Sequence, residues 1–367
     1  MSNRNLKILA VTALAMIIWA VVQSKIANRH TTITKLNTPL IQGLVTSNID
    51  SIVPAHGEDI ATLKKQGKIF VVKDKDNYPA SMEKINNLIT SILDIRVNEL
   101  FTSNPENHKD LEVANENAQN VVKFLDKEGK LLAGVVIGKR EYKRKITYVR
   151  RLVQDKKESN KVYTSSNVPW LQTSAISYID KRLFKVEKTD IARVSAGGPD
   201  GTYRIKADEN GKITVHKAIP EGKKLKDTDY ENVFTAVTNL EFDDVQKESD
   251  KTADLKFDRV FVCELNDATI ATFKLAKKDD KNYVKCEAKY TGDLRITESD
   301  VKKASEEELK KNEAKLLARD AAVEFTKKHK GWIYQISSNK AGNMTKKFED
   351  LLENKEKEKE EKAQEKK

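Results

Sequence analysis

Histidines, cysteines and clustered carboxylates are the side chains here that could hold a metal or act in catalysis. His30, His56, His108, His216 and His329 are scattered along 367 residues, and none has a second His or Cys at the spacing of metal ligands. The nearest cluster begins at His56 and continues with Gly, Glu and Asp, but it falls between two expected strands, where polar turn residues are common. The sequence therefore predicts no metal and no cofactor.

Motifs for nucleotide binding or nucleophilic catalysis are missing too. The chain contains no Gly-x-x-x-x-Gly-Lys-Ser/Thr loop, no Gly-x-Gly-x-x-Gly and no Gly-x-Ser-x-Gly elbow. The richest glycine cluster, Ala196 to Gly201, contains Gly-Pro-Asp-Gly, which a tight turn explains more simply than a phosphate site. Acidic pairs such as Asp243-Asp244 lie in expected loops, where carboxylates stay hydrated. We expect no enzymatic activity, and an active site of unfamiliar design is the alternative.

The strongest local charge signal is a basic stretch in the first half of the chain. Its members are Lys139, Arg140, Lys143, Arg144, Lys145, Arg150 and Arg151, followed by Lys156 and Lys157. Tyr142 and Tyr148 lie among them, and this mixture suits an anion or an acidic partner. A solvated strand face explains the same pattern, because alternate strand residues point outward. The net charge of +11 comes from lysines interleaved with Glu and Asp along the chain, so we expect no nucleic-acid binding.

Residues 1–27 have the layout of an export signal that stays attached as a membrane anchor. Arg4 and Lys7 precede a run that is apolar except for Thr12 and ends before Gln23. The run includes Ile8, Leu9, Leu14, Ile17, Ile18, Trp19 and Val22. Retention is favoured over cleavage because no good cleavage site follows the run and Trp19 suits the membrane interface. We expect a single-pass protein of the bacterial inner membrane with its bulk in the periplasm.

The rest of the chain divides by composition into a linker, two modules and a tail. Residues 28–39 predict a polar linker, and residues 40–184 and 185–354 predict two modules of antiparallel sheet plus an amphipathic helix. Residues 299–330 predict a charged helical insertion with a capping box at Ser305 and Glu308. Residues 355–367 predict a charged tail. The predicted fold class is α+β, with two tandem repeated modules preceded by one transmembrane helix.

The repeat is predicted from matches that keep the same order in both halves. Residues 191–194 match 49–53, residues 211–215 match 67–71, and the hairpin at 260–275 matches that at 122–137. The first helix is predicted from a stripe of apolar residues, Ile85, Leu88, Ile89 and Ile92. It is expected to return at Val233, Val237 and Leu240, which keep the spacing of Ile85, Ile89 and Ile92. Each match alone is weak, so the conserved order carries the inference.

Cys263 and Cys286 are the two cysteines of the chain. If residues 259–290 form three successive antiparallel strands, the cysteines lie on the first and the third. Strands that are next but one lie roughly 10 Å apart, whereas the Cα atoms of a disulfide must lie within about 7 Å. The sequence therefore predicts two cysteines that do not bridge within one chain.

Several stretches resemble a known family. Asn77-Tyr78-Pro79-Ala80-Ser81 runs into the first expected helix, Ser103-Asn104-Pro105-Glu106-Asn107 follows it, and the stretch from Trp170 to Phe184 is similar too. Together they resemble the bacterial domain-of-unknown-function family number 4340, in which an N-terminal anchor precedes one or two such modules. Members are often encoded beside ABC-type transporters of the gliding-motility kind. The resemblance implies an accessory role at the cell envelope and supplies no catalytic residues.

The expected function is a membrane-anchored extracytoplasmic binding or structural component, accessory to an envelope ABC-type transport system. Its expected partners are the membrane, through the N-terminal helix, and transporter subunits. Two alternatives remain. One is a lipid- or glycan-binding protein of the envelope, with its ligand at the basic stretch or on an apolar face between the modules. The other is an enzyme with an unrecognised site.

Overall fold

The computed structural model describes residues 36–355, except 115, 227 and 294–304, together with Met16 and Trp19. These residues divide into two compact units. The first unit contains residues 36–70 and 82–174, and the second contains 71–81 and 175–355. The second unit thus includes residues 175–184 and 71–81, which the sequence analysis placed in the first module.

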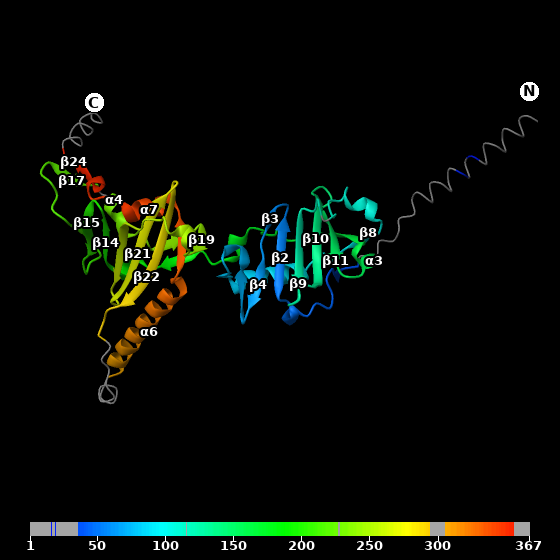
Figure 1. The fold of residues 1–367 in the computed structure, drawn as a ribbon, viewed down its shortest axis with the longest axis horizontal. Coiled ribbons are helices and arrows are strands. Elements are labelled where there is room, and N and C mark those ends of the chain that lie inside the picture. Colours follow the sequence, from blue (N-terminus) through cyan, green and yellow to red (C-terminus); the bar gives the residue numbers. More distant parts are fainter. Residues whose placement is uncertain are drawn as a thin grey trace, which may run out of the picture. The chain divides into compact units, whose positions relative to one another are not determined.

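The first unit is built on one antiparallel sheet (Figure 1). Its strands are β2 (Ser51–His56), β4 (Leu63–Gln66), β5 (Ile69–Val72), β8 (Glu99–Thr102), β9 (Asn120–Leu125), β10 (Leu131–Glu141), β11 (Ile146–Leu152) and β12 (Val162–Ser165), with the short β3 (Asp59–Ile60) beside β2. The short strand β6 (Tyr78–Pro79) pairs with the end of β5 at residues 71 and 72, within the segment that belongs to the second unit. The strands follow the order β6-β5-β4-β2-β9-β10-β11-β12-β8. A separate pair joins β1 (Thr38–Pro39) to β7 (Arg96–Val97).

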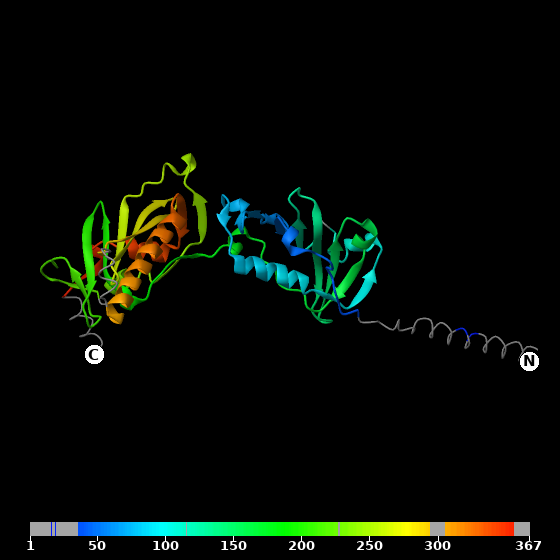
Figure 2. The same ribbon diagram turned by 90° about the horizontal axis from the view of Figure 1, so that it is seen from below.

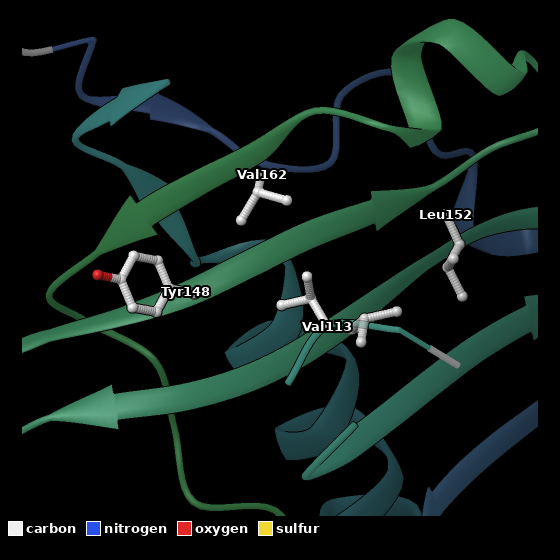
Figure 3. Close-up of a cluster of buried hydrophobic side chains, with 5 residues drawn as sticks. Val113, Tyr148, Leu152 and Val162 are labelled. Carbon is white, nitrogen blue, oxygen red and sulfur yellow. The ribbon is translucent and has the colours of Figure 1, made fainter. Parts of the chain in front are cut away.

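Both faces of this sheet are covered. Helix α2 (Met82–Leu93) buries Ile85, Leu88 and Ile92, the stripe that the sequence predicts, and Figure 2 shows it along one face. Residues 103–119 cover the other face. Val113 enters a cluster with Val136, Tyr148, Leu152 and Val162, and Figure 3 shows four of these side chains converging. Six consecutive residues of β10, from 133 to 138, are therefore buried.

The second unit contains the second large sheet and most of the remaining elements. Its strands are β14 (Ile191–Gly198), β15 (Gly201–Ala207), β16 (Ile213–His216), β19 (Asp244–Lys247), β20 (Arg259–Leu265), β21 (Thr269–Lys278), β22 (Lys281–Tyr290) and β23 (Trp332–Ile336). Their order is β16-β15-β14-β20-β21-β22-β23-β19. Two further pairs are β13 (Arg182–Lys185) with β18 (Asn239–Glu241) and β17 (Lys223–Leu225) with β24 (Leu352–Asn354).

Strand order is shared between the two sheets. Eight strands of the first sheet have a counterpart at the same place in the second. In chain order, the strands of the first sheet are β2, β4, β5, β8, β9, β10, β11 and β12, and their counterparts are β14, β15, β16, β19, β20, β21, β22 and β23. The small pair β1 and β7 likewise corresponds to β13 and β18. The order of the sequence matches is thus the order of the strands.

The predicted fold class is nevertheless wrong. The described chain consists mostly of large antiparallel sheets, and it shows no repeated amphipathic helix. Where the second such helix was expected, helix α4 (Asp229–Phe234) ends after six residues, and Leu240 and Val245 lie in strands β18 and β19. The reason is local. Thr235, Val237 and Thr238 are β-branched and Asn239 follows them, so the sequence after Phe234 disfavours a longer helix even though Val233, Ala236 and Val237 are buried.

The predicted membrane anchor lies outside the described residues, apart from Met16 and Trp19, which are helical and exposed. Ile8, Leu9, Leu14, Ile17, Ile18 and Val22 are therefore not placed, and the same holds for residues 28–35 of the linker and 356–367 of the tail. Where the structure does describe the chain, none of its helices combines the length and the apolar character needed to cross a membrane.

Helix α6 (Glu306–His329) lies beside the edge of the second sheet, next to β22 (Figure 1). Its capping box forms as predicted at Ser305 and Glu308. Strand β23 pairs with β22 only at residues 282–284. Further along β22, helix α6 packs against the strand instead. There Thr326 Oγ1 accepts a hydrogen bond from the Ala288 amide at 2.8 Å and donates one to the Ala288 carbonyl at 2.7 Å. The helix thereby satisfies backbone groups at an edge that would otherwise stay open.

Residues 71–81 pack within the second unit through their polar and aromatic side chains. Lys75 Nζ lies 2.6 Å from Asp244 Oδ1. The Tyr78 ring is buried, with its centroid 4.8 Å from that of Trp332 and 6.0 Å from that of Phe242. The Tyr-Pro segment on which the family resemblance rests thus has a structural role. The remaining helices are α3 (Lys156–Ser159) in the first unit and α7 (Ser338–Thr345) in the second.

Candidate interaction surface

The basic stretch surrounds the turn that joins β10 to β11. Residues 142–145 form this turn, and all four are exposed, with Tyr142 at 75%. The Lys145 amide donates to the Tyr142 carbonyl at 3.2 Å, and Lys145 adopts a left-handed φ of 51°. The chain reverses tightly here, so the aromatic ring and three cations project from the end of the sheet together.

Trp170 lies beside this turn because Arg140 holds it there. The Arg140 guanidinium donates to the carbonyls of Val168 at 3.3 Å and Pro169 at 2.9 Å. The same group lies 4.2 Å from the centroid of the Trp170 ring, a cation–π contact. Trp170 is nevertheless 73% exposed. The indole is therefore held against Arg140 while most of its surface stays open to solvent.

Phe101, on the edge strand β8, supplies a second aromatic contact to this part of the unit. Its ring centroid lies 4.8 Å from that of Tyr148, and Phe101 is 44% exposed. The Tyr148 hydroxyl donates to Glu141 Oε1 at 2.7 Å, and Glu141 Oε2 lies 3.6 Å from Arg144 Nη1. Burial, reinforced by the carboxylate of Glu141, raises the pKa of Tyr148 to about 12.

Arg150 and Arg151 belong to the predicted basic stretch but lie away from the turn. The Arg150 side chain is buried, and its guanidinium donates to the carbonyls of Val113 at 2.9 Å and Ser159 at 3.1 Å. Burial lowers its pKa. Arg151 Nη2 lies 3.3 Å from Glu158 Oε2. These two arginines therefore hold parts of the unit together, and the structure does not bring them to the same surface as the others.

Five cations of the basic stretch join Tyr142 and Trp170 in what we name the turn surface, which consists of Lys139, Arg140, Tyr142, Lys143, Arg144, Lys145 and Trp170. Lys156 and Lys157 lie in α3. Five of the seven side chains of the turn surface are cationic, and Glu141 is the one acidic residue from 139 to 145. Its lysines and Arg144 are exposed, so the surface is positively charged and carries two exposed aromatic rings. Exposed Trp, Tyr and Arg side chains are types that are enriched in protein interfaces.

Trp170 is the member that sequence reasoning missed. From Trp170 the structure has an irregular segment, then a short 3-10 turn (Ala175–Tyr178) and β13. Pro169 directly before Trp170 was the available signal, because proline favours extended or turn conformations around it. An indole in such a segment has no helix neighbours to cover it.

Other motifs of chemical interest have structural roles. The glycine cluster forms the predicted turn, where Gly198 pairs with Gly201 between β14 and β15. Asp200 Oδ2 in this turn lies 3.0 Å from Arg259 Nη2 and 3.1 Å from Lys347 Nζ, and these two cations lower its pKa. Nowhere in the described ranges do three His, Cys, Asp or Glu side chains gather as a metal site requires.

Comparison with known proteins gives one family match. The model of the family described as Domain of unknown function (DUF4340) matches residues 71–260. The matched range begins in β5 and ends in β20, so it includes parts of both sheets and the whole turn surface. A comparison with curated proteins found no match.

Proposed function

Because the chain belongs to the DUF4340 family, whose function is unknown, we propose a role from its own surface: a non-catalytic binding component of the bacterial cell envelope. In this proposal the turn surface binds an acidic region of a protein partner. The apolar run in residues 1–27 keeps the protein at the inner membrane with its bulk in the periplasm. The partner is a subunit of an ABC-type transport system, to which the protein is accessory.

The observation that carries the proposal is the pairing of Arg140 with Trp170. Trp, Tyr and Arg are the residues that most often dominate the binding energy of protein interfaces, and they do so where their position is fixed before binding. Here the guanidinium lies 4.2 Å from the ring centroid and is also bound to two carbonyls. An indole held in this way loses little conformational freedom when a partner covers it.

Charge defines the kind of partner. The cations at 139, 140, 143, 144 and 145 outnumber the single acid Glu141, so a complementary surface carries Asp and Glu. Complementary charge accelerates association and excludes partners of the same sign, and an apolar contact on Trp170 and Tyr142 then supplies affinity. The described surface thus fits an acidic protein region that also presents an apolar side chain.

The test uses the full-length protein in its native membranes, with crosslinking, affinity purification and mass spectrometry. We expect the wild-type protein to recover transporter subunits, with crosslinks from Lys139, Lys143 and Lys145. Trp170→Ala, and separately Lys143→Glu combined with Lys145→Glu, should abolish recovery of the partner and the crosslink from Lys139, which both variants retain. Lys127→Glu combined with Lys130→Glu is the matched control, because both lysines are exposed at the β9–β10 turn of the same unit. Equal recovery of the partner by all variants, or recovery of no partner by the wild type, would refute the proposal.

A further inference from the structure

A groove in the second unit lies between the sheet and the C-terminal end of α6. It has a volume of about 360 Å³ and is lined by β21, β22, α6 and the first residue of β23. The lining side chains that matter here are Thr272, Lys274, Lys285, His329, Lys330 and Trp332. This volume falls within the range of about 300–1,000 Å³ that small-molecule sites have.

His329 is the distinctive member of this groove. The residue is 2% exposed, and its Nδ1 lies 2.6 Å from the Tyr334 hydroxyl oxygen. Its other ring nitrogen, Nε2, is buried and has no hydrogen-bond partner among the described residues. Leaving such a polar atom unpaired costs about 1–3 kcal/mol, so native proteins nearly always satisfy it. A partner for Nε2 is therefore expected from outside the part of the chain that the structure describes.

The imidazole that presents this nitrogen is neutral. Burial, together with the charge of Lys328, lowers the pKa of His329 to about 3. The Tyr334 hydroxyl lies between His329 Nδ1 and the Tyr78 hydroxyl, which is 3.4 Å away. If Tyr334 donates to Nδ1, then Nε2 carries the hydrogen and donates; if Nδ1 donates to Tyr334, then Nε2 accepts. A ligand hydroxyl serves either arrangement, because it both donates and accepts.

The other lining groups define the rest of the ligand. Lys274, Lys285 and Lys330 outnumber Glu287, the one carboxylate in the lining. Lys274 Nζ lies 3.3 Å from Glu287 Oε1, and Lys285 pairs with Glu248, so both lysines already have acidic neighbours and the surplus charge is modest. Trp332 adds an aromatic surface on which the apolar face of a small ring can lie.

We propose that this groove binds a small hydroxylated organic anion of monosaccharide size. A ligand hydroxyl is the partner of His329 Nε2, the anionic group is held by Lys330 and Lys274, and the ring lies against Trp332. The anionic group is a carboxylate or a phosphate, which share this recognition chemistry. The inference rests on residues of the second unit alone, so it is independent of partner binding at the turn surface.

The first experiment observes His329 directly in the unmodified full-length protein. Histidine is labelled with ¹⁵N, and glucuronate, glucose 6-phosphate, glucose and hexanoate are titrated in turn. We expect the His329 Nε2 resonance to move with glucuronate or glucose 6-phosphate, and which of the two binds more tightly identifies the anionic group. Binding should be at least roughly tenfold weaker for glucose, which lacks the charge, and for hexanoate, which lacks the hydroxyls.

Two variants test the contacts without disturbing the core. Lys330→Ala removes a cation just after α6 and should weaken the binding of glucuronate or glucose 6-phosphate by roughly tenfold. Lys277→Ala, at the exposed end of β21, is the control and should bind as the wild type does. The proposal is overturned if neither anion moves the His329 resonance, if glucose binds as tightly as the anions, or if Lys330→Ala has no effect. None of these results bears on crosslinking at the turn surface.

Discussion

Arg150 Nε donates a hydrogen bond of 2.9 Å to the carbonyl oxygen of Val113, and this contact ties the segment before β9 to the middle of β11. The same guanidinium reaches the Ser159 carbonyl at the end of α3. One buried cation thus joins three separate segments of the first unit. Hydrogen bonds to charged groups are stronger than neutral ones, and Val113 is fully buried.

Replacing Arg150 by Met should destabilise the first unit by about 2–4 kcal/mol, because two carbonyls lose a charged donor while the apolar stem is kept. Two units make a single unfolding transition unreliable as a readout. Hydrogen exchange of peptides covering residues 103–119 and 153–161 measures the effect locally. We expect faster exchange there and no change in the second unit.

Arg151→Met is the matched control for Arg150→Met. Arg151 is the next residue on β11, and its ion pair with Glu158 is partly exposed, which predicts a loss of less than about 1 kcal/mol. Equal exchange rates in the two variants would show that Arg150 does not hold the covering segment, residues 103–119, against the sheet.

Gly138→Ala tests the same covering segment from the sheet side. A Cβ atom at residue 138 would overlap the Leu111 carbonyl oxygen and lie 2.5 Å from Val113 Cγ1. We expect a loss of about 1–3 kcal/mol, because the backbone of residues 111–113 must move. Gly342→Ala in α7 is the contrasting change. Nothing lies within 4 Å of its added methyl, so stability should rise by about 0.5–1 kcal/mol. Hydrogen exchange of peptides covering residues 103–119 measures the first change, and that of peptides covering α7 measures the second. Slower exchange of residues 103–119 in Gly138→Ala would show that this close approach is not rigid.

Sequence reasoning succeeded where one local signal decided the outcome. The stripe that includes Ile85, Leu88 and Ile92 predicted α2, and the capping box at Ser305 and Glu308 predicted the start of α6. Hairpins such as β9 with β10 and β20 with β21 followed from alternating apolar residues around a turn. In each case the residues concerned are close in sequence, so tertiary contacts did not have to be known.

The failures depend on contacts between distant residues. Arg150 and Lys143 look alike in sequence, and only the covering segment with Val113 makes one of them buried. Residues 71–81 precede α2 but pack in the second unit, where Tyr78 meets Trp332. His329 could not be distinguished from the other histidines, because its burial depends on how α6 lies beside the sheet. No local pattern encodes such contacts.

The phenol of Tyr148 should make the first unit sensitive to alkali. Its pKa is about 12 in the folded protein, whereas 10.0 is the ordinary value for a tyrosine and the value expected in the unfolded chain, so folding favours the neutral form. This contribution to stability is fully present below pH 10 and is lost as pH rises through 12, by about 1.4 kcal/mol per pH unit between them. Stability measured from pH 9 to 12 should fall less in Tyr148→Phe than in the wild type. Parallel curves for the two proteins would contradict the assignment.

Cys263 and Cys286 should be unreactive in the native protein. They lie on β20 and β22 with β21 between them, as predicted, and both are buried free thiols. Burial raises the pKa of Cys263 to about 12 and that of Cys286 further, which leaves almost no thiolate near neutral pH. We expect no labelling by iodoacetamide at pH 8 until denaturant is added, when both label. Rapid labelling of the folded protein, or an internal disulfide in non-reducing peptide mapping, would be inconsistent with this packing.

His329 should make the second unit sensitive to acid. Its pKa is lowered from 6.5 to about 3 in the folded protein, so protons bind the unfolded chain more readily across this window. The stability that comes from the neutral imidazole is fully present above pH 6.5. It is lost as pH falls toward 3, by about 1.4 kcal/mol per pH unit.

Carboxylates such as Asp200 and Asp254 also have lowered pKa values and add to the acid dependence, so the comparison must be with a variant. His329→Gln keeps a polar side chain of similar size but cannot take up a proton. The difference in unfolding free energy between wild type and His329→Gln, measured by urea titration without ligand, should shrink steadily from pH 7 to pH 4. A difference that stays constant over this range would mean that folding does not lower the pKa of the imidazole, a result that its burial beside Phe325 and Tyr334 argues against.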